Sequence, residues 1–157
     1  MALAKLYMPF IKVYIHFVWS TKNRIPFLKT IEIREAMWQH IIKNAEEKGI
    51  YIDFINGYID HCHCLISLGS DQNISKIMQL IKGESANWFN KQGFIDEKFQ
   101  WQEEYFAVSV SESILEKVRK YIKNQETHHQ KKTFQDEYLE LIEKFGFKEF
   151  NDETTKI

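Results

Sequence analysis

The chain has 157 residues and a formal net charge of −1; 44% of its residues are hydrophobic and 15% are aromatic. This length is enough for one domain with a substantial core, and the near-neutral charge excludes a global basic field that would bind nucleic acid non-specifically. Two prolines, six glycines and no apolar run of the roughly 18 residues that a membrane span needs argue against disorder and a membrane partner. We therefore expect a single domain over residues 1–157.

The distribution of charge is uneven along the chain. Residues 1–132 hold 18 Lys and Arg against 15 Asp and Glu, whereas residues 133–157 hold 3 against 7. A mildly basic body with an acidic tail is compatible with a phosphate-rich ligand. The N-terminus lacks the pattern of a signal peptide, and the only cysteines, Cys62 and Cys64, are poorly placed for a disulfide. These features predict a cytoplasmic protein.

The first half of the chain reads as strand, helix and strand. Residues 11–19 alternate between apolar and polar side chains, which is typical of a half-buried strand, and residues 20–26 form a polar loop. Thr30 is placed to cap a helix that Gly49 ends, and residues 50–58 form the second strand. The apolar positions of this helix recur every four residues: Ile33, Met37, Ile41 and Ala45.

A turn over residues 56–60 leads into a third strand that carries two histidines. Side chains alternate on a strand, so His61 and His63 point the same way, roughly 7 Å apart along the chain. Cys62 and Cys64 point the other way, towards a buried face. Paired imidazoles on one face offer two ligands to a metal ion, although two polar side chains on the wet side of a sheet are an equally good interpretation.

The second half of the chain adds a helix, a strand and two further helices. Asn73 is placed to cap a second amphipathic helix, which Gly83 interrupts, and residues 105–110 form a fourth strand. Ser113 and Glu116 make a capping box for a third helix to about residue 130. A shorter helix over about 135–145, ended by Gly146, precedes a polar tail.

This order of elements is the β-α-β-β-α-β pattern of the ferredoxin-like α+β fold. Its antiparallel sheet has both helices on one face and leaves the other face open, so we expect His61 and His63 on the open face, within reach of a large ligand. The core is expected over about residues 11–130. The third helix and the short extra helix are additions at the C-terminal end, with residues 131–157 as helix and tail.

The third helix carries Tyr121 and Gln125, four residues apart and therefore on one face. Each residue alone is most simply a packing or surface residue. Beside the histidine strand they form a coherent set, because phosphodiester cleavage needs a hydroxyl nucleophile and stabilisation of charge on the phosphate. A divalent ion held by His61, His63 and one oxygen ligand could supply that stabilisation, with Gln125 as the oxygen ligand.

Several cations are candidate phosphate contacts, and solvated surface charges are the alternative interpretation. They lie in the loop after the first strand, on the second helix and beside Tyr121: Lys22, Arg24, Lys82, Arg119, Lys120 and Lys123. His16 is expected on the outer face of the first strand as a surface residue, with an approach to the site as the alternative. His128 and His129 follow Tyr121 where cations favour a helix C-terminus; a metal or phosphate role is the alternative.

The pattern His61-Cys62-His63 resembles the HUH motif (histidine, bulky hydrophobic residue, histidine) of single-strand DNA nucleases, with cysteine as a small departure at its centre. The segment 121–125 resembles the tyrosine helix of the single-tyrosine transposases of the insertion-sequence 200/605 family. The resemblance extends over roughly residues 11–145. It includes the stretches 18–24, 81–83, 101–102, 106–110 and 124–129.

The resemblance implies an enzyme that cuts and rejoins single-stranded DNA at transposon ends carrying a hairpin. Tyr121 would be the nucleophile and form a 5′-phosphotyrosine intermediate, and His61, His63 and Gln125 would hold Mg²⁺ or Mn²⁺. Family members are homodimers in which the tyrosine helix can pair with the HUH strand of the other subunit, so the active sites can be composite. The resemblance also implies a bacterial or archaeal, DNA-associated protein.

Two alternatives keep part of this interpretation. A domesticated relative would process chromosomal hairpin repeats by the same chemistry. A non-catalytic module would hold single-stranded nucleic acid on the open sheet, as RNA-recognition domains do. The set of His61, His63, Tyr121 and Gln125 argues against a non-catalytic module, because binding alone does not need it.

Overall fold

The structure is a computed structural model that describes residues 9–129 and 132–145. It divides into two compact units, Met1–Gln125 and Glu126–Ile157, each of which is described by itself. The expectation of one domain over residues 1–157 stays a prediction. Within the described part of the chain, no helix is long and apolar enough to cross a membrane.

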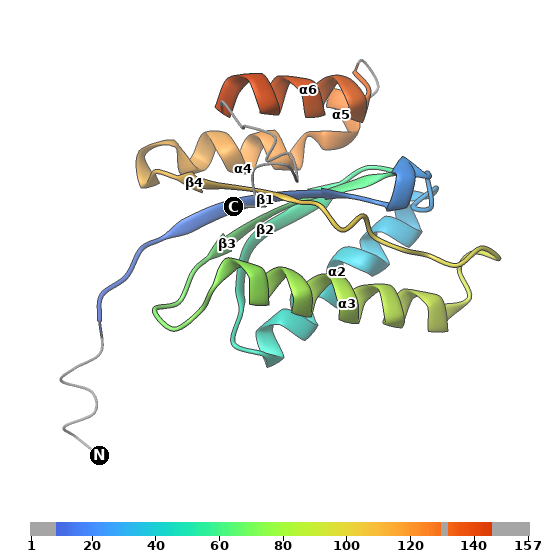
Figure 1. Cartoon of the computed structure of the whole chain (residues 1–157), viewed down its shortest axis with the longest axis horizontal. Coiled ribbons are helices and arrows are strands. Elements are labelled where there is room, and N and C mark those ends of the chain that lie inside the picture. The colour runs from blue at the N-terminus through green and yellow to red at the C-terminus, as the bar shows by residue number, and fades with distance from the viewer. Residues whose placement is uncertain (1–8, 130–131, 146–157) are drawn as a thin grey trace, which may run out of the picture. The chain divides into compact units, whose positions relative to one another are not determined.

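The first unit is built on a four-stranded antiparallel sheet with the strand order β2-β3-β1-β4. The strands are β1 (Tyr14–Ser20), β2 (Tyr51–Gly57), β3 (His61–Ser67) and β4 (Phe106–Val110). Helices α2 (Ile31–Glu47) and α3 (Ile74–Gln92) connect them, and both lie on the same side of the sheet (Figure 1). This is the expected ferredoxin-like α+β fold.

The two connecting helices begin where the sequence predicts. The side chain of Thr30 accepts a hydrogen bond from the backbone N–H of Ile33, and Asn73 does the same for Lys76. Gly49 has a φ of 73°, a left-handed conformation that glycine adopts readily at the end of a helix. Gly83 does not interrupt the second helix, because α3 runs through it without a break.

The main core lies between the sheet and these two helices. It contains the inward side chains of β1 and β3 together with those of α2 and α3, including Phe17, Trp19, Cys62, Cys64 and Met37. Burial raises the pKa of both the Cys62 and the Cys64 thiols above the usual range, and both cysteines are unpaired and buried. Uncharged thiols act here as small apolar side chains.

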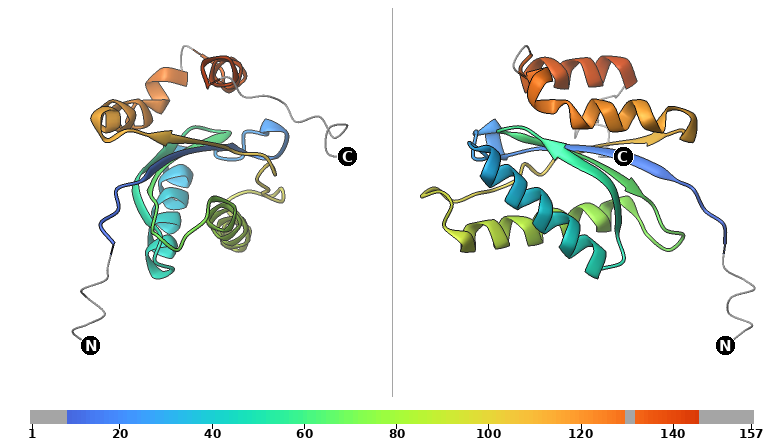
Figure 2. Two further views of the ribbon diagram at one scale, coloured as in Figure 1. Left: turned by 60° about the vertical axis from the view of Figure 1, so that its left-hand side comes forward. Right: turned by 180° about the vertical axis from the view of Figure 1, so that it is seen from behind.

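The opposite face of the sheet is not open, and this prediction was wrong. A short 3₁₀ turn, η2 (Glu112–Ile114), leads into α4 (Leu115–Lys123), which packs across this face (Figures 1 and 2). A second apolar cluster forms between them from Leu65, Val110, Leu115 and Ile122. The reason is that Leu65 and Val110 would leave apolar surface in water if no helix covered them.

The predicted third helix is also shorter than expected. Ser111, not Ser113, supplies the side-chain cap, by accepting a hydrogen bond from the Ser113 backbone N–H at the start of η2. The helix then breaks at Asn124 (φ −93°, ψ 20°) and continues as α5 (Gln125–His129). Tyr121 and Gln125 therefore belong to two helices.

The second unit contains most of α5 and the helix α6 (Phe134–Phe145). Thr133 caps α6, since its hydroxyl accepts a hydrogen bond from the Asp136 backbone N–H at 3.2 Å. The Nε2 atoms of His128 and His129 lie 3.0 and 2.7 Å from the buried Glu137 carboxylate. His129 Nδ1 also lies 2.7 Å from the Lys132 carbonyl oxygen. Gly146, the expected helix stop, lies outside the described residues.

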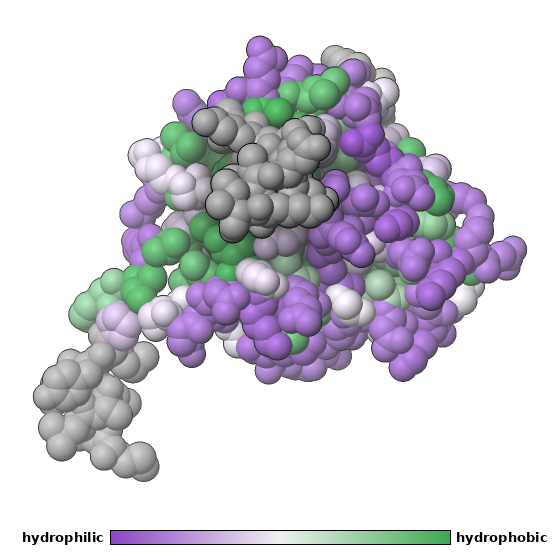
Figure 3. Space-filling model, in the orientation of Figure 1, coloured by the Kyte–Doolittle hydropathy of each residue, from purple (hydrophilic) through white to green (hydrophobic). Residues whose placement is uncertain are grey.

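Figure 3 shows a hydrophobic surface where the chain enters β1. Phe10, Ile11 and Val13 are exposed in this segment. The predicted strand over residues 11–19 thus begins only at Tyr14, although the Val13 carbonyl still accepts a hydrogen bond from the Leu68 backbone N–H at 2.7 Å.

Candidate active site

The histidine pair lies on the α4 side of β3, and both side chains are fully buried. The alternation expected from the sequence holds, because Leu65 on the same face packs under α4 while Cys62 and Cys64 enter the main core. The ring centroids of His61 and His63 are 5.2 Å apart, with the planes at 80°. The imidazoles are thus neighbours in a covered site rather than ligands on a solvated sheet.

Each of the two histidines has a partner at its Nδ1 atom. Asp60 Oδ1 lies 2.9 Å from His61 Nδ1, and His16 Nε2 lies 2.9 Å from His63 Nδ1. Partners of this kind fix the tautomer and the ring orientation of metal-binding histidines. Because Nδ1 of each ring is engaged in this way, Nε2 is the atom of each histidine that would bind an ion.

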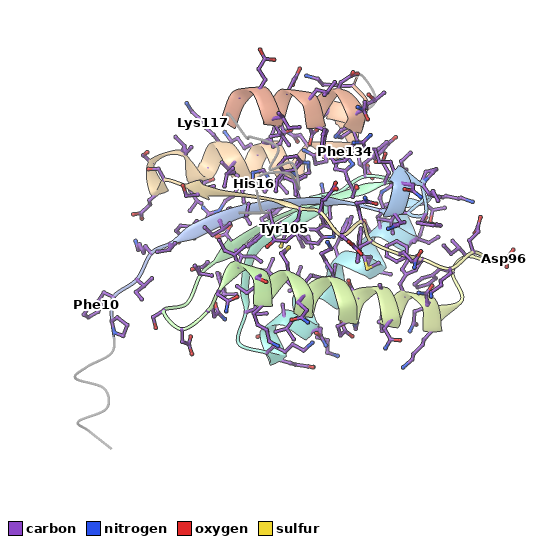
Figure 4. The ribbon with its side chains drawn as sticks, in the orientation of Figure 1. Phe10, His16, Asp96, Tyr105, Lys117 and Phe134 are labelled. Atoms are coloured by element: carbon purple, nitrogen blue, oxygen red, sulfur yellow. The ribbon has the colours of Figure 1, made fainter. Side chains whose placement is uncertain are left out.

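His16 was expected to be a surface residue, and this was wrong. It is 6% exposed, and it projects from β1 on the α4 side of the sheet (Figure 4). β1 pairs with β3 so that Val18 lies opposite His63, which brings His16 diagonally beside His63. The sequence contained a signal for this position. His16 alternates with Ile15 and Phe17, which enter the main core, so it belongs to the opposite face of β1.

Gln125 connects the histidine strand to Tyr121. Its side-chain amide donates to the Tyr121 carbonyl oxygen at 3.1 Å, and its Oε1 lies 3.1 Å from His61 Nε2. The donor role of the amide fixes the orientation of the group, since a carbonyl oxygen only accepts. An oxygen is therefore presented to His61, although Gln125 follows the break at Asn124.

Tyr121 lies beside the same histidines. Its ring centroid is 5.5 Å from that of His63 and 6.4 Å from that of His16, both in edge-to-face arrangements. The side chain is half-buried and also packs against the second apolar cluster. The four residues predicted from the sequence as a site, His61, His63, Tyr121 and Gln125, do come together.

Two contacts from β2 hold α4 on the sheet. Asn56, which pairs with His63 across the strands, donates through Nδ2 to the carbonyls of Ile122 (3.1 Å) and Lys123 (3.0 Å). Asp53 lies at a β-bulge and binds Arg119 through two hydrogen bonds of 2.7 and 2.6 Å. No motif in the sequence indicated these contacts, because they join residues more than sixty positions apart.

The donor set fits a divalent metal ion. Two ligands about 2.1 Å from an ion and at right angles lie about 3.0 Å apart, and His61 Nε2 and Gln125 Oε1 are separated by 3.1 Å. A ring nitrogen of His61 and one of His63 lie within 4.8 Å of each other. Two imidazoles and an amide oxygen suit Mn²⁺ better than Mg²⁺, which prefers oxygen ligands.

The six predicted cationic contacts lie in different surroundings. Arg119 of α4 forms a structural ion pair with Asp53 of β2 and a second one with Glu116. Its hydrogen bonds to these two carboxylates raise its pKa. Lys120 and Lys123 are exposed on α4. Lys22 and Arg24 are half-buried in a 3₁₀ turn, η1 (Lys22–Arg24), and Lys82 lies on the other side of the sheet, on α3. Three of the six cations therefore share α4 with Tyr121, and their role as phosphate contacts stays a prediction.

Residues 10–125 match the model of the family described as "Transposase IS200 like", so the chain belongs to the IS200-like transposase family. The matched range includes all four residues of the candidate site and ends with Gln125.

A sequence relative agrees with this family, and two solved structures share the fold. The chain is similar to the ISDra2 transposase TnpA of Deinococcus radiodurans, with 27% identity over 115 residues that cover 70% of this chain and 81% of the relative. A crystal structure from Deinococcus radiodurans, described as a transposase, matches with a TM-score of 0.61 and 22% identity, over 74% of this chain and 93% of that one. A REP-associated tyrosine transposase bound to a REP hairpin matches with a TM-score of 0.53 and 21% identity, over 80% of this chain and 72% of that one.

Proposed function

We propose that the protein cuts and rejoins single-stranded DNA at hairpin-bearing transposon ends through a covalent intermediate on Tyr121. One observation carries this proposal: Gln125 Oε1 faces His61 Nε2 at 3.1 Å while the Tyr121 ring lies 5.5 Å from the His63 ring. A possible nucleophile and a possible metal site are thus adjacent. A binding module has no use for such an arrangement.

In the proposed reaction, the Tyr121 hydroxyl oxygen attacks the scissile phosphorus. The new bond joins the tyrosine oxygen to the 5′ phosphate, and the bond from phosphorus to the 3′ oxygen breaks. The phenol loses one proton and the leaving 3′ oxygen gains one, so the step is balanced and releases a 3′ hydroxyl. Attack by another 3′ hydroxyl on the phosphotyrosine reverses the step and rejoins the strand without an external energy source.

The chain's own residues would position this chemistry. We assign His61, His63 and Gln125 as the ligands of Mg²⁺ or Mn²⁺, with Asp60 and His16 orienting the two imidazoles. When bound, the ion would polarise the phosphate and stabilise charge on the leaving 3′ oxygen. His61 and His63 are buried in the structure, and electrostatic interactions of this kind are stronger where water is excluded.

We also propose a hairpin-bearing single strand as the DNA partner and a homodimer as the active assembly. The solved REP-associated transposase carries a hairpin, and the TnpA relative acts in transposition by its name; both support a DNA substrate of this kind. The contacts of Asn56 and Asp53 with α4 support a tyrosine that acts on the histidines of its own chain. We further expect a DNA-associated protein of the cytoplasm.

A covalent-adduct assay tests the proposed function. The protein is mixed with labelled single strands from the gene's own flanks and Mn²⁺ or Mg²⁺, and the products are separated on a denaturing gel. We expect a shifted band that EDTA removes and that Tyr121→Phe abolishes while DNA binding persists. Binding without an adduct, for both flanks and both ions, would contradict the transposase chemistry and favour the non-catalytic module.

A mixing experiment separates the two arrangements of the dimer. Tyr121→Phe and His61→Ala chains are each expected to be inactive, and the mixture is expected to remain inactive if Tyr121 acts within its own chain. An adduct that appears only on mixing would show that the tyrosine of one subunit serves the histidines of the other.

A further inference from the structure

A groove of about 630 Å³ lies on the side of the sheet opposite α4, between α3 and the segment of residues 98–105 that leads into β4. Most of the residues that line it are polar, and Figure 3 shows a largely hydrophilic surface where these elements lie. Exposed amide groups of Gln79, Asn87 and Gln100 line it. Amide side chains can both donate to and accept from base edges.

The walls of the groove are fixed to each other. Asn90 donates to the Phe99 carbonyl at 3.0 Å and accepts from the Phe99 backbone N–H at 2.8 Å. Trp101, which is buried, donates its indole N–H to Ser85 Oγ at 2.9 Å. The segment is thus anchored to α3 at two points, so the groove exists before any ligand arrives.

A cation and an aromatic ring lie together at one end of the groove. Lys82 Nζ lies 5.6 Å from the centroid of the Tyr105 ring and donates to the Glu103 carbonyl at 2.9 Å. Figure 4 shows Tyr105 on the α3 side of the sheet. Burial lowers the pKa of Lys82 to about 8, against the opposing effect of Glu103 and Glu104. A phosphate would compensate for the loss of hydration of this ammonium group.

Gly83 lines the groove, and among the described residues none packs against the position that its side chain would take. A Cβ atom built on it meets no atom within 4 Å, and its φ is in the ordinary helical range. Glycine inside a helix costs about 1 kcal/mol relative to alanine, and no contact among the described residues offsets this cost. A glycine at such a position allows a ligand to approach the helix backbone closely.

The groove is connected to the candidate active site through η1. The Lys22 backbone N–H donates to the Gln100 carbonyl at 2.8 Å, and the N–H of the preceding Thr21 donates to the carbonyl of Asp60, next to His61, also at 2.8 Å. These two hydrogen bonds place the basic turn between the histidines and the groove. Within the turn, Asn23 and Arg24 have φ values of 54° and 56°, which are costly for non-glycine residues.

We propose that this groove is a second DNA-binding site, which takes unpaired nucleotides of the substrate strand, with a base against Tyr105 and Gly83 and a phosphate on Lys82. The strand would pass from the histidines over Lys22 and Arg24 into the groove. This inference rests on the proposed function for the identity of the ligand. Stacking on an aromatic ring and one phosphate contact require no particular sequence.

The test blocks the groove without removing a charge. In the Tyr121→Phe background, where no cleavage competes, fluorescence anisotropy measures binding of labelled single strands from the gene's own flanks. Gly83→Leu is expected to raise Kd about tenfold, the order of a lost stacking contact, and Gln92→Leu, a change outside the groove on the same helix, is expected to leave it within about twofold. Thermal unfolding checks folding, and leucine should keep or raise the midpoint of Gly83→Leu.

A second measurement does not depend on substitution. A strand containing 5-bromodeoxyuridine is irradiated with the Tyr121→Phe protein, and the crosslinked peptide is expected to contain Tyr105. Lys82→Gln should weaken binding more than Lys91→Gln, which removes an exposed charge from α3 outside the groove.

The outcomes separate this inference from the proposed function. If the wild type forms the covalent adduct but Gly83→Leu binds DNA as tightly as Gln92→Leu and no crosslink reaches Tyr105, the groove is not a DNA site and the transposase chemistry stands. If no adduct forms but the groove variants weaken binding, the transposase chemistry fails and the groove stands as a nucleic-acid site.

Discussion

Asn56 offers a direct test of how α4 is held over the histidines. Its Nδ2 donates to the last two carbonyls of α4, those of Ile122 and Lys123, which are carbonyls that a helix end leaves without intrahelical partners. Each such hydrogen bond contributes about 0.5–1.5 kcal/mol. Asn56→Ala is therefore expected to lower the free energy of unfolding by about 1–3 kcal/mol.

Asn56→Asp is the sharper variant, because it keeps the shape of the side chain and replaces the donor with a carboxylate. Two carbonyl oxygens and the negative end of the helix dipole would then face a negative charge, which adds about 0.3–1 kcal/mol of destabilisation. The predicted order of stability in urea denaturation is Asn, Ala, Asp. An aspartate variant as stable as the wild type would refute this account of the contact.

The size of the effect also predicts which motion follows. Burial of the α4 side chains Leu115 and Ile122 against the sheet contributes about 1.5–3 kcal/mol for each side chain, and together they contribute more than the contact of Asn56. Asn56→Ala should therefore loosen the end of α4 without releasing the helix. Hydrogen exchange should accelerate at the α4 amides near Ile122 and remain slow in β3, and the yield of covalent adduct should fall because Gln125 follows this end.

Three further predictions test other parts of the molecule. His16→Phe keeps a ring beside His63 but removes the ring nitrogens of position 16, and calorimetry is expected to show Mn²⁺ binding weakened about 10- to 100-fold. An unchanged affinity would mean that His16 does not support the metal site. Gly57→Ala would place a Cβ atom 2.1 Å from the His61 carbonyl oxygen, so it should lower the free energy of unfolding by about 1–3 kcal/mol or more; an unchanged denaturation midpoint would contradict the close approach. Because the pKa of Lys82 is lowered to about 8, its charge is present below that pH and lost above it. Single-strand binding should therefore weaken between about pH 7 and pH 9 in the wild type and stay level in Lys82→Arg. An equal loss in both proteins would exclude Lys82 as the cause.

The residues that could be predicted from sequence are those whose local pattern determines their environment. The alternation around His61 and His63 placed them on one face of a strand, and side-chain caps at Thr30 and Asn73 marked the helix starts. The spacing of Tyr121 and Gln125 indicated that they could act together, and the structure brings them to the histidines. These patterns depend on neighbours within a few positions.

The cover over the histidines depends on contacts between distant residues, and two signals for it were present. Leu115, Val118 and Ile122 recur at helical spacing on α4, and Leu65 is an apolar residue on the same face of β3 as the histidines. Together they require the sheet face to be packed, because neither apolar surface is stable in water. The break at Asn124 had no such signal, since no glycine or proline occurs there.

The hydrogen bond from the Gln125 side chain to the Tyr121 carbonyl oxygen has a consequence for the control of strand cutting. In the proposed mechanism these two residues supply the attacking hydroxyl and one of the metal ligands, and the bond ties them together. Any movement of this part of the chain away from β3 would withdraw both at once and leave His61 and His63 as an incomplete ion site. Such an enzyme is competent or inert as a whole, which would protect the host's single-stranded DNA from stray nicks whenever the site is not assembled.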